Sequence, residues 1–196
     1  MIKKLKIKSK IHDYNILFEN NLGSIFKKIP DESVFLVDKK VKYLYLNKFL
    51  KNKIFFCVDS NEKNKDFVHL NKYINFFIKN VSKETKVYAI GGGVVQDITS
   101  FLCSIYKRGV AWTFIPTTII SQADSCIGGK TSINFNGIKN QLGNFYPPQK
   151  IILNPQFING LSKNQLYSGL GEMGHYFLLS NYKDYNFYKK KFNKNK

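Results

Sequence analysis

The chain has 196 residues, of which 43% are hydrophobic and 22% are charged, and its formal net charge at pH 7 is +18. This length can bury the core of one ordinary domain, and the composition excludes a disordered chain. The positive charge would suit a nucleic-acid partner, but Arg108 is the only arginine and the lysines are scattered through every segment. Because specific nucleic-acid readers rely on arginine forks, we expect no specific nucleic-acid partner, whereas an anionic phosphate substrate would profit from the positive field.

The cysteines and the hydropathy pattern indicate where the protein works. Cys57, Cys103 and Cys126 are odd in number and show no Cys-x-x-Cys spacing, which fits thiols in a reducing cytosol. The lysine-rich start is not followed by the apolar region of a signal peptide, and no apolar run approaches membrane-spanning length. We therefore expect a cytoplasmic protein with no membrane association.

The first part of the chain alternates between predicted strands and helices. Partial alternation at 2–8 and 14–19 predicts an antiparallel pair, and apolar runs predict strands at 33–37 and 53–58. Helical spacing predicts helices at 20–28, 41–50 and 67–80, the last with an inward stripe of Phe67, Leu70, Ile74, Phe77 and Ile78.

Two charged sites in this part have alternative interpretations. Asp38 stands at the end of a predicted strand, where a carboxylate can accept hydrogen bonds from a ribose or can cap the following helix. Glu62 and Lys65 lie three residues apart in a polar loop, where a plain solvated charge run is the competing interpretation.

The stretch that organises the chain begins with a strand and a glycine turn. Val87–Ile90 is a short apolar run, and Gly91, Gly92 and Gly93 separate it from a helix with apolar residues at Val95, Ile98, Phe101, Leu102 and Ile105. Glycines at such a turn let a phosphate approach the first N–H groups of the helix. A glycine triplet alone is weak evidence, and it is not the G-x-G-x-x-G pattern.

A second strand end completes the predicted site. It carries Pro116-Thr117-Thr118 and leads into the polar loop 124–131. Lys130 is followed by a threonine, as in a Walker motif, but Asp124 stands where that motif needs a glycine. Adjacent strand ends bearing such residues are the usual place for a nucleotide and a charged substrate. With a further strand at 151–153 and a helix at 165–181, the pattern predicts an α/β, Rossmann-like, mostly parallel sheet with helices on both faces.

The sequence motifs follow one another in an order that is typical of one protein family. GGGVVQD, YKRG, PTT, QADSCIGGKT, GIKNQLGNFYPP and GLGEM follow one another with the order and spacing of the 3-dehydroquinate synthase family, in the sugar-phosphate cyclase branch of its fold. The glycine turn and PTT are shared with iron-type alcohol and glycerol dehydrogenases, whereas DSCIGGKT followed by KN resembles the cyclases alone. The resemblance covers Ala89–Glu172 and is thin before Lys86.

The resemblance implies roles for individual residues. NAD would contact Asp38, Glu62, Lys65, Gly92, Gly93, Val94, Asp97, Ile98, Thr117, Thr118 and Lys139. The phosphorylated sugar-acid substrate would contact Asp124, Lys130, Asn140 and, from a neighbouring subunit of a homodimer, Arg108. The catalytic group would be Lys130, Asn140 and His175.

Glu172 matches the family's ligand for a divalent metal, zinc or cobalt. His175 stands where the cyclases have a lysine, and we expect it to be a substrate contact or a neighbour of the site. Gly160 replaces a residue that usually supplies a hydroxyl. A catalytic metal needs about three protein ligands, and His12, His69 and His175 are the only histidines. We therefore expect a fragment, one half of a split enzyme or a degenerate relative.

The expected domains are an NAD-binding α/β domain at 1–160 and, at 161–196, the first helix of a helical metal-binding domain, otherwise largely missing, with a basic tail. The implied reaction is the NAD-dependent conversion of 3-deoxy-D-arabino-heptulosonate 7-phosphate to 3-dehydroquinate and phosphate. It is a carbon–oxygen lyase reaction of the shikimate route to chorismate and the aromatic amino acids. Another sugar-phosphate cyclase, or a non-catalytic NAD-binding remnant, is the alternative.

Overall fold

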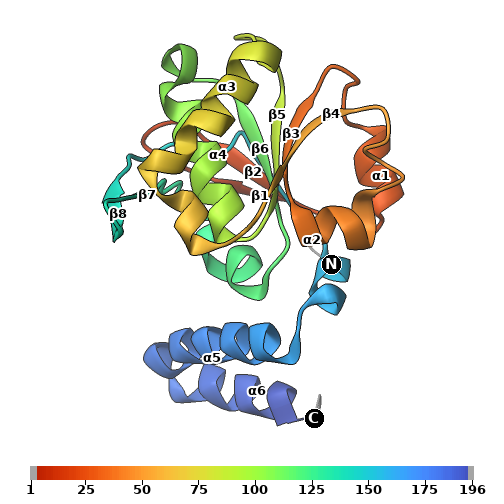
Figure 1. The fold of residues 1–196 in the computed structure, drawn as a ribbon. Helices are drawn as coiled ribbons and strands as arrows, with labels where there is room; N and C mark the ends of the chain where they lie inside the picture. Colours follow the sequence, from red (N-terminus) through yellow and green to blue (C-terminus); the bar gives the residue numbers. More distant parts are fainter. Residues whose placement is uncertain (1–3, 194–196) are drawn as a thin grey trace.

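A seven-stranded sheet forms the centre of the molecule (Figure 1). The computed structural model describes residues 4–193. The strand order is β1-β2-β9-β6-β5-β3-β4, in which β1 pairs antiparallel with β2 and the five other pairings are parallel. The strands are β1 (Lys4–Ile7), β2 (Tyr14–Phe18), β3 (Val34–Asp38), β4 (Ile54–Val58), β5 (Val87–Gly91), β6 (Trp112–Pro116) and β9 (Lys150–Leu153). The predicted, mostly parallel sheet is confirmed, as is the N-terminal antiparallel pair within the described residues.

Helices cover both faces of the sheet because its central strands are apolar on both sides. In β3, Val34 and Leu36 pack into one core, while Phe35 and Val37 pack into the other. The first core contains α3 (Leu70–Asn80) and α4 (Gly93–Ile105), and the second contains α1 (Leu22–Lys27) and the helical segment formed by α2 (Lys39–Val41) and η1 (Lys42–Leu46). Figure 1 shows these two layers on opposite sides of the strands.

The order of the parallel strands creates a switch point. From β3 the chain moves outward to β4, and it then returns to place β5 on the other side of β3. Connections that leave neighbouring strands in opposite directions open a crevice at their carboxyl ends, where α/β sheets bind ligands. The fold therefore places a ligand crevice beside Asp38 and the glycine turn.

Short turns connect these elements. They are η2 (Glu62–Lys65), η3 (Phe67–His69), η4 (Tyr106–Arg108), η5 (Ser121–Ser125) and η6 (Pro155–Gly160). Among residues 4–193, no helix is both long and apolar enough to cross a bilayer.

A small hairpin was missed from the sequence. β7 (Ile133–Phe135) and β8 (Ile138–Leu142) pair antiparallel around Asn136 and Gly137, whose φ angles are +49° and +76°. Asn-Gly between apolar residues is the strongest short hairpin signal, because both residues tolerate the left-handed region that the turn requires. The signal was present in the sequence.

The C-terminal residues form a helical hairpin that projects from the α/β domain (Figure 1). α5 (Lys163–Ser180) confirms the predicted helix, and Ser162 and Gln165 form a capping box at its start. A second helix that the sequence did not predict, α6 (Tyr182–Asn193), carries the lysines of the expected basic tail through residue 193; it folds back and stacks Tyr188 on Phe177 at 4.9 Å between ring centroids. The proposed boundary at residue 160 stays a prediction.

The predicted inward stripe of α3 is partly wrong. Leu70 and Phe77 are buried, but Phe67 is 45% exposed and Ile78 is 63% exposed. Residues 67–69 form a separate 3₁₀ turn before α3, so the helical phase starts later than the sequence pattern implied. Tyr73 takes the buried place instead.

The set of α3 residues that faces the core gives a prediction about stability. Phe77→Ala should lower the free energy of unfolding by about 3–5 kcal/mol, because it leaves a cavity between α3 and the sheet. Ile78→Ala is the matched control next to it and should change that free energy by less than about 0.5 kcal/mol. Urea unfolding measures both, and equal losses would contradict the observed phase of α3.

Candidate nucleotide and substrate site

The glycine turn between β5 and α4 packs closely against other parts of the chain. A Cβ on Gly91 would lie 2.5 Å from Val95 Cγ2, and a Cβ on Gly92 would lie 2.9 Å from Thr118 Cγ2. In contrast, a Cβ on Gly93 would meet nothing within 4 Å in the described part of the chain. The first two glycines therefore serve close packing, and the third keeps space open at the start of α4.

The first turn of α4 has free N–H groups at this open space. Gly92 is the N-cap and, among residues 4–193, no side chain caps the helix; the amide of Gln96 donates to the Gly92 carbonyl at 3.0 Å. The preceding amides have no partner within a helix, and the helix dipole makes this end positive. An anionic group is the ligand that this end favours.

A crevice of about 180 Å³ lies against this turn. Its walls come from the carboxyl ends of β3, β5 and β6 and from η1 and η6, including Asp38, Val94, Thr117, Thr118 and Tyr45. Asp38 Oδ1 also accepts a hydrogen bond from the Val41 amide at 2.8 Å. The capping interpretation of Asp38 is thus confirmed, and the same residue lines the crevice.

Tyr45 is a crevice residue that the sequence did not indicate. A Cβ on Gly160 would lie 2.6 Å from Tyr45 Oη, so the phenol occupies the place of a side chain at position 160. Burial raises the pKa of the Tyr45 phenol, which stays a neutral hydroxyl at the crevice wall. A hydroxyl from η1 therefore lies beside position 160.

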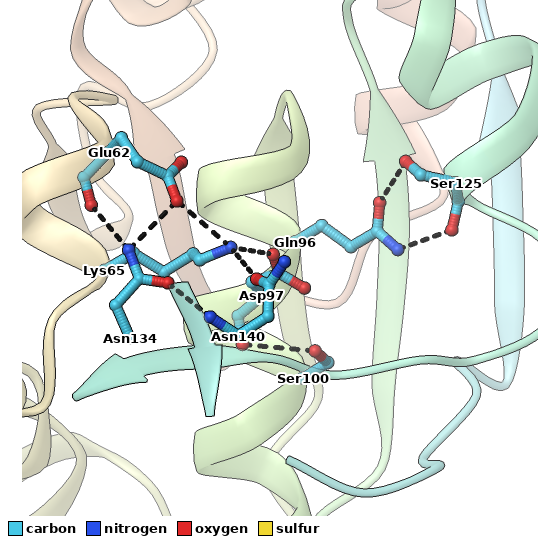
Figure 2. A network of polar contacts seen from close by, with 8 residues as sticks. All are labelled: Glu62, Lys65, Gln96, Asp97, Ser100, Ser125, Asn134 and Asn140. Carbon is cyan, nitrogen blue, oxygen red and sulfur yellow. Dashed lines mark hydrogen bonds and ion pairs between the residues drawn. The ribbon is translucent and has the colours of Figure 1, made fainter. Parts of the chain in front are cut away.

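A network of polar side chains surrounds Lys65 beside α4 (Figure 2). Lys65 is only 5% exposed, and its Nζ lies 3.0 Å from Asp97 Oδ2, 2.8 Å from Asn140 Oδ1 and 3.4 Å from Glu62 Oε1. The alternative of a solvated charge run is therefore wrong for Lys65. The structure brings four of the predicted site residues together around one ammonium group.

The two carboxylates of this network differ in acidity. Burial raises the pKa of Asp97, against the opposing effect of the Lys65 ammonium. For Glu62, burial also acts upward, but hydrogen bonding from Asn134 and the charge of Lys65 outweigh it and lower the pKa. Asp97 is thus the carboxylate that takes up a proton more readily.

Asn134 is a second residue that the sequence did not indicate. Its side chain is buried, its Nδ2 donates to Glu62 Oε1 at 3.0 Å, and its Oδ1 accepts from the Asn140 amide at 2.9 Å. Asn140 has a φ of +59°, a conformation that asparagine tolerates better than most residues. Asn134 therefore fixes the strained backbone that presents the Asn140 side chain to Lys65.

The predicted substrate loop begins beside α4. Gln96 exchanges two hydrogen bonds with Ser125, and the nearby Asp124 carboxylate raises the pKa of Tyr176 on α5. Lys130 and Lys139 are exposed, and the charge of Lys139 helps to lower the pKa of Glu62. Lys139 thus lies near the network.

Ile98 and Arg108 lie outside both the crevice and the Lys65 network. The Ile98 side chain is fully buried in the core and does not line the crevice. Arg108 is exposed at the far end of α4, and a helix of 13 residues spans about 20 Å. Its proposed contact with a neighbouring subunit's substrate stays a prediction.

The described residues do not complete a metal site. Glu172 and His175 are exposed on α5, and no group of three or more His, Cys, Asp or Glu side chains within residues 4–193 could hold a metal ion. Catalytic zinc needs about three protein ligands. Cys126 is no candidate nucleophile, because burial raises the pKa of its thiol to about 12.

A parallel sheet with a glycine-lined helix start at its switch point defines a Rossmann-like protein of the dinucleotide-binding class. Residues 55–168 match the family model described as 3-dehydroquinate synthase N-terminal. The chain belongs to the 3-dehydroquinate synthase family, which confirms the resemblance seen in the sequence.

Relatives and solved structures agree with this assignment. The 3-dehydroquinate synthase of Clostridium tetani is 36% identical over 180 residues, which are 85% of this chain and 48% of the relative. A 2-epi-5-epi-valiolone synthase from Streptomyces hygroscopicus, solved with NAD+ and Zn2+, is 28% identical with a TM-score of 0.71 over 86% of this chain and 49% of that one. A 2-deoxy-scyllo-inosose synthase, at 21% identity and a TM-score of 0.73, shares the fold over 85% of this chain and 50% of its own. The chain spans about half the length of the curated relatives it matches.

The buried ion pair gives a pH-dependent prediction. Lys65→Met should lower the free energy of unfolding by about 3 kcal/mol at pH 7, because it leaves Asp97 buried without its cation. A carboxyl whose pKa is raised on folding binds a proton more readily in the folded state, so lowering the pH through that pKa stabilises the variant. The difference from the wild type should therefore shrink between pH 7 and pH 5 in urea unfolding.

The double variant Lys65→Met/Asp97→Asn is the control for this experiment. It removes both charges and should recover at least half of the loss at pH 7, with a weaker pH dependence. A loss that stays the same at both pH values in the single variant would argue against Asp97 as the stranded group.

Proposed function

We propose that this chain is the dinucleotide-binding part of a sugar-phosphate cyclase of the 3-dehydroquinate synthase type. The observation that carries the proposal is the uncapped first turn of α4, which faces an open crevice at the switch point of the sheet. The 2-epi-5-epi-valiolone synthase with which the chain shares 28% identity was solved with NAD+, which supports NAD as the ligand of this crevice.

The crevice residues fit a dinucleotide. The amides of Gly93 and Val94 at the helix start would receive the diphosphate, and the open space at Gly93 leaves room for it. Asp38 and Thr118 offer oxygen atoms to ribose hydroxyls, and Tyr45 adds a neutral hydroxyl at the wall. These contacts would hold and orient NAD, whose chemistry is to accept a hydride from the substrate and later return it.

The phosphorylated sugar-acid substrate would lie beside the polar network. Asn140 belongs to this network, Lys130 and Asp124 belong to the predicted substrate loop, and the net charge of +18 favours an anionic substrate. In the 3-dehydroquinate synthase reaction, 3-deoxy-D-arabino-heptulosonate 7-phosphate would become 3-dehydroquinate and phosphate, a carbon–oxygen lyase reaction of the shikimate route in the cytoplasm. His175, in place of a lysine, leaves another carbocyclic product as the alternative.

The protein's own contribution to this chemistry is orientation. The Lys65 ammonium group holds the Asp97 carboxylate and the Asn140 side chain in fixed positions. Asn134 accepts a hydrogen bond from the Asn140 backbone amide and so holds the hairpin that carries Asn140. Asp97, whose pKa burial raises, would lie with its Lys65 partner beside the bound ligands.

Turnover needs a metal centre that residues 4–193 do not complete. Glu172 would supply one carboxylate, and further ligands would have to come from other polypeptide. This observation favours a second proposal for the chain by itself, namely an NAD-binding unit that turns over only with a partner segment. A homodimer, in which Arg108 reaches a neighbouring site, belongs to the same proposal.

Gly93→Ala tests the nucleotide crevice. The added methyl group meets no neighbouring atom of residues 4–193, so the fold should be unaffected, but it narrows the approach to the first amides of α4. NAD affinity by calorimetry should fall at least about 10-fold, a loss of about 1.4 kcal/mol.

Gly171→Ala is the matched control for this variant. A methyl group on Gly171 would likewise meet no atom of residues 4–193 within 4 Å, but Gly171 lies on α5 outside the crevice. The NAD affinity of this variant should equal that of the wild type. Equal affinities in all three proteins would remove the glycine turn from the binding site.

Lys130→Met tests the substrate loop. A phosphonate analogue of the heptulosonate phosphate should bind at least about 10-fold more weakly to the NAD-loaded variant, because a charge-assisted hydrogen bond is lost. Lys51→Met removes the same charge from an exposed turn that precedes β4, at the amino end of that strand and away from the carboxyl ends that form the site, and should leave binding unchanged. Similar losses in both variants would indicate a non-specific charge effect.

A further inference from the structure

Gln96 connects the nucleotide turn to the predicted substrate loop. Its Nε2 donates to the Ser125 carbonyl at 2.6 Å, and its Oε1 accepts from the Ser125 hydroxyl at 2.7 Å. Figure 2 shows this pair of bonds extending from α4 away from the Lys65 network. Both ends of the Gln96 amide are therefore used on one residue of another segment, 29 positions further along the chain.

The Gln96 side chain lies outside the binding crevice. The side chain is only 5% exposed, and it is not among the residues that line the crevice. Its own amide donates to the carbonyl of Gly92, so its backbone belongs to the turn that would hold the diphosphate. The buried side-chain amide of Gln96 has little rotational freedom because both its nitrogen and its oxygen are hydrogen-bonded. A displacement of the glycine turn would therefore move Ser125 as well.

Ser125 is a junction between two parts of the site. Asp124, the neighbouring residue, lies close enough to the Tyr176 hydroxyl to raise its pKa, and Tyr176 lies on α5 one helical turn after Glu172. The Asp124–Ser125 pair is thus bonded to α4 and lies beside α5. The loop therefore lies between the nucleotide turn and the helix that carries the predicted metal ligand.

We infer that Gln96 is the positioning residue that fixes Asp124 and Ser125 to the first turn of α4 and so aligns the substrate loop with bound NAD. The inference rests on the proposed function, since it takes NAD as the ligand of the crevice. Gln96 acts through Ser125 and touches neither ligand.

Hydrogen–deuterium exchange of the full chain, with and without NAD, tests this role. In the wild type, saturating NAD should slow exchange in segment 121–127 about fivefold or more, the lower end of ordinary coupling between sites. In Gln96→Met, which keeps the length of the side chain but loses both hydrogen bonds, this protection should fall below about twofold. The NAD affinity of Gln96→Met should stay within about threefold of the wild type, because Gln96 does not line the crevice.

Further variants keep the test decisive if Gln96→Met folds poorly. Ser125→Ala removes one of the two bonds and should give intermediate protection, and Ser125→Thr keeps the hydroxyl and should restore it. Gln149→Met makes the same chemical change at an exposed glutamine before β9 and should behave as the wild type.

The outcomes distinguish the two proposals. If calorimetry finds no NAD binding to the wild type, the proposed function fails. If NAD binds but segment 121–127 is not protected, or is protected equally in Gln96→Met, the role of Gln96 is overturned. A Gln96→Met variant that loses NAD affinity would also overturn it, because the residue would then act on binding itself.

Discussion

The buried ammonium group of Lys65 is the interaction on which the site depends. An unpaired charge inside a protein costs many kcal/mol, so Lys65 can be buried only with acceptors around it. Asp97 lies 32 residues away in the sequence and Asn140 lies 75 residues away. Satisfying this one group therefore requires η2, α4 and the β7–β8 hairpin to meet at one place.

The same requirement places the two halves of the candidate site at consecutive turns of α4. The glycine turn at the start of the helix faces the crevice, and Asp97, one turn later, faces the network. Consecutive turns of one helix thus contribute to the nucleotide crevice and to the Lys65 network. Gln96, which lies between Gly93 and Asp97, connects the helix to the loop at Ser125. The spacing of these functions follows from the 3.6-residue period of the helix.

Features that depend on neighbouring residues could be predicted from the sequence, and features that depend on distant partners could not. The buried strands and the glycine turn at Gly91–Gly93 follow from local patterns, and the family motifs supplied the predicted site residues. Glu62 and Lys65 looked equally like a solvated pair, because their partners are far away in the chain. The α3 stripe was misplaced because a 3₁₀ turn precedes the helix, and α6 was missed because lysines mask aromatic residues that pack on α5.

The contact between Tyr45 and Gly160 limits how this family member can evolve. A serine or threonine at position 160 would place its Cβ 2.6 Å from the Tyr45 hydroxyl and 2.9 Å from Tyr45 Cε2, so the phenol would have to shift to accommodate it. Positions 45 and 160 are therefore coupled, and the effect of a substitution at one depends on the residue at the other. A side chain at position 160 is accommodated more easily when position 45 carries a smaller residue.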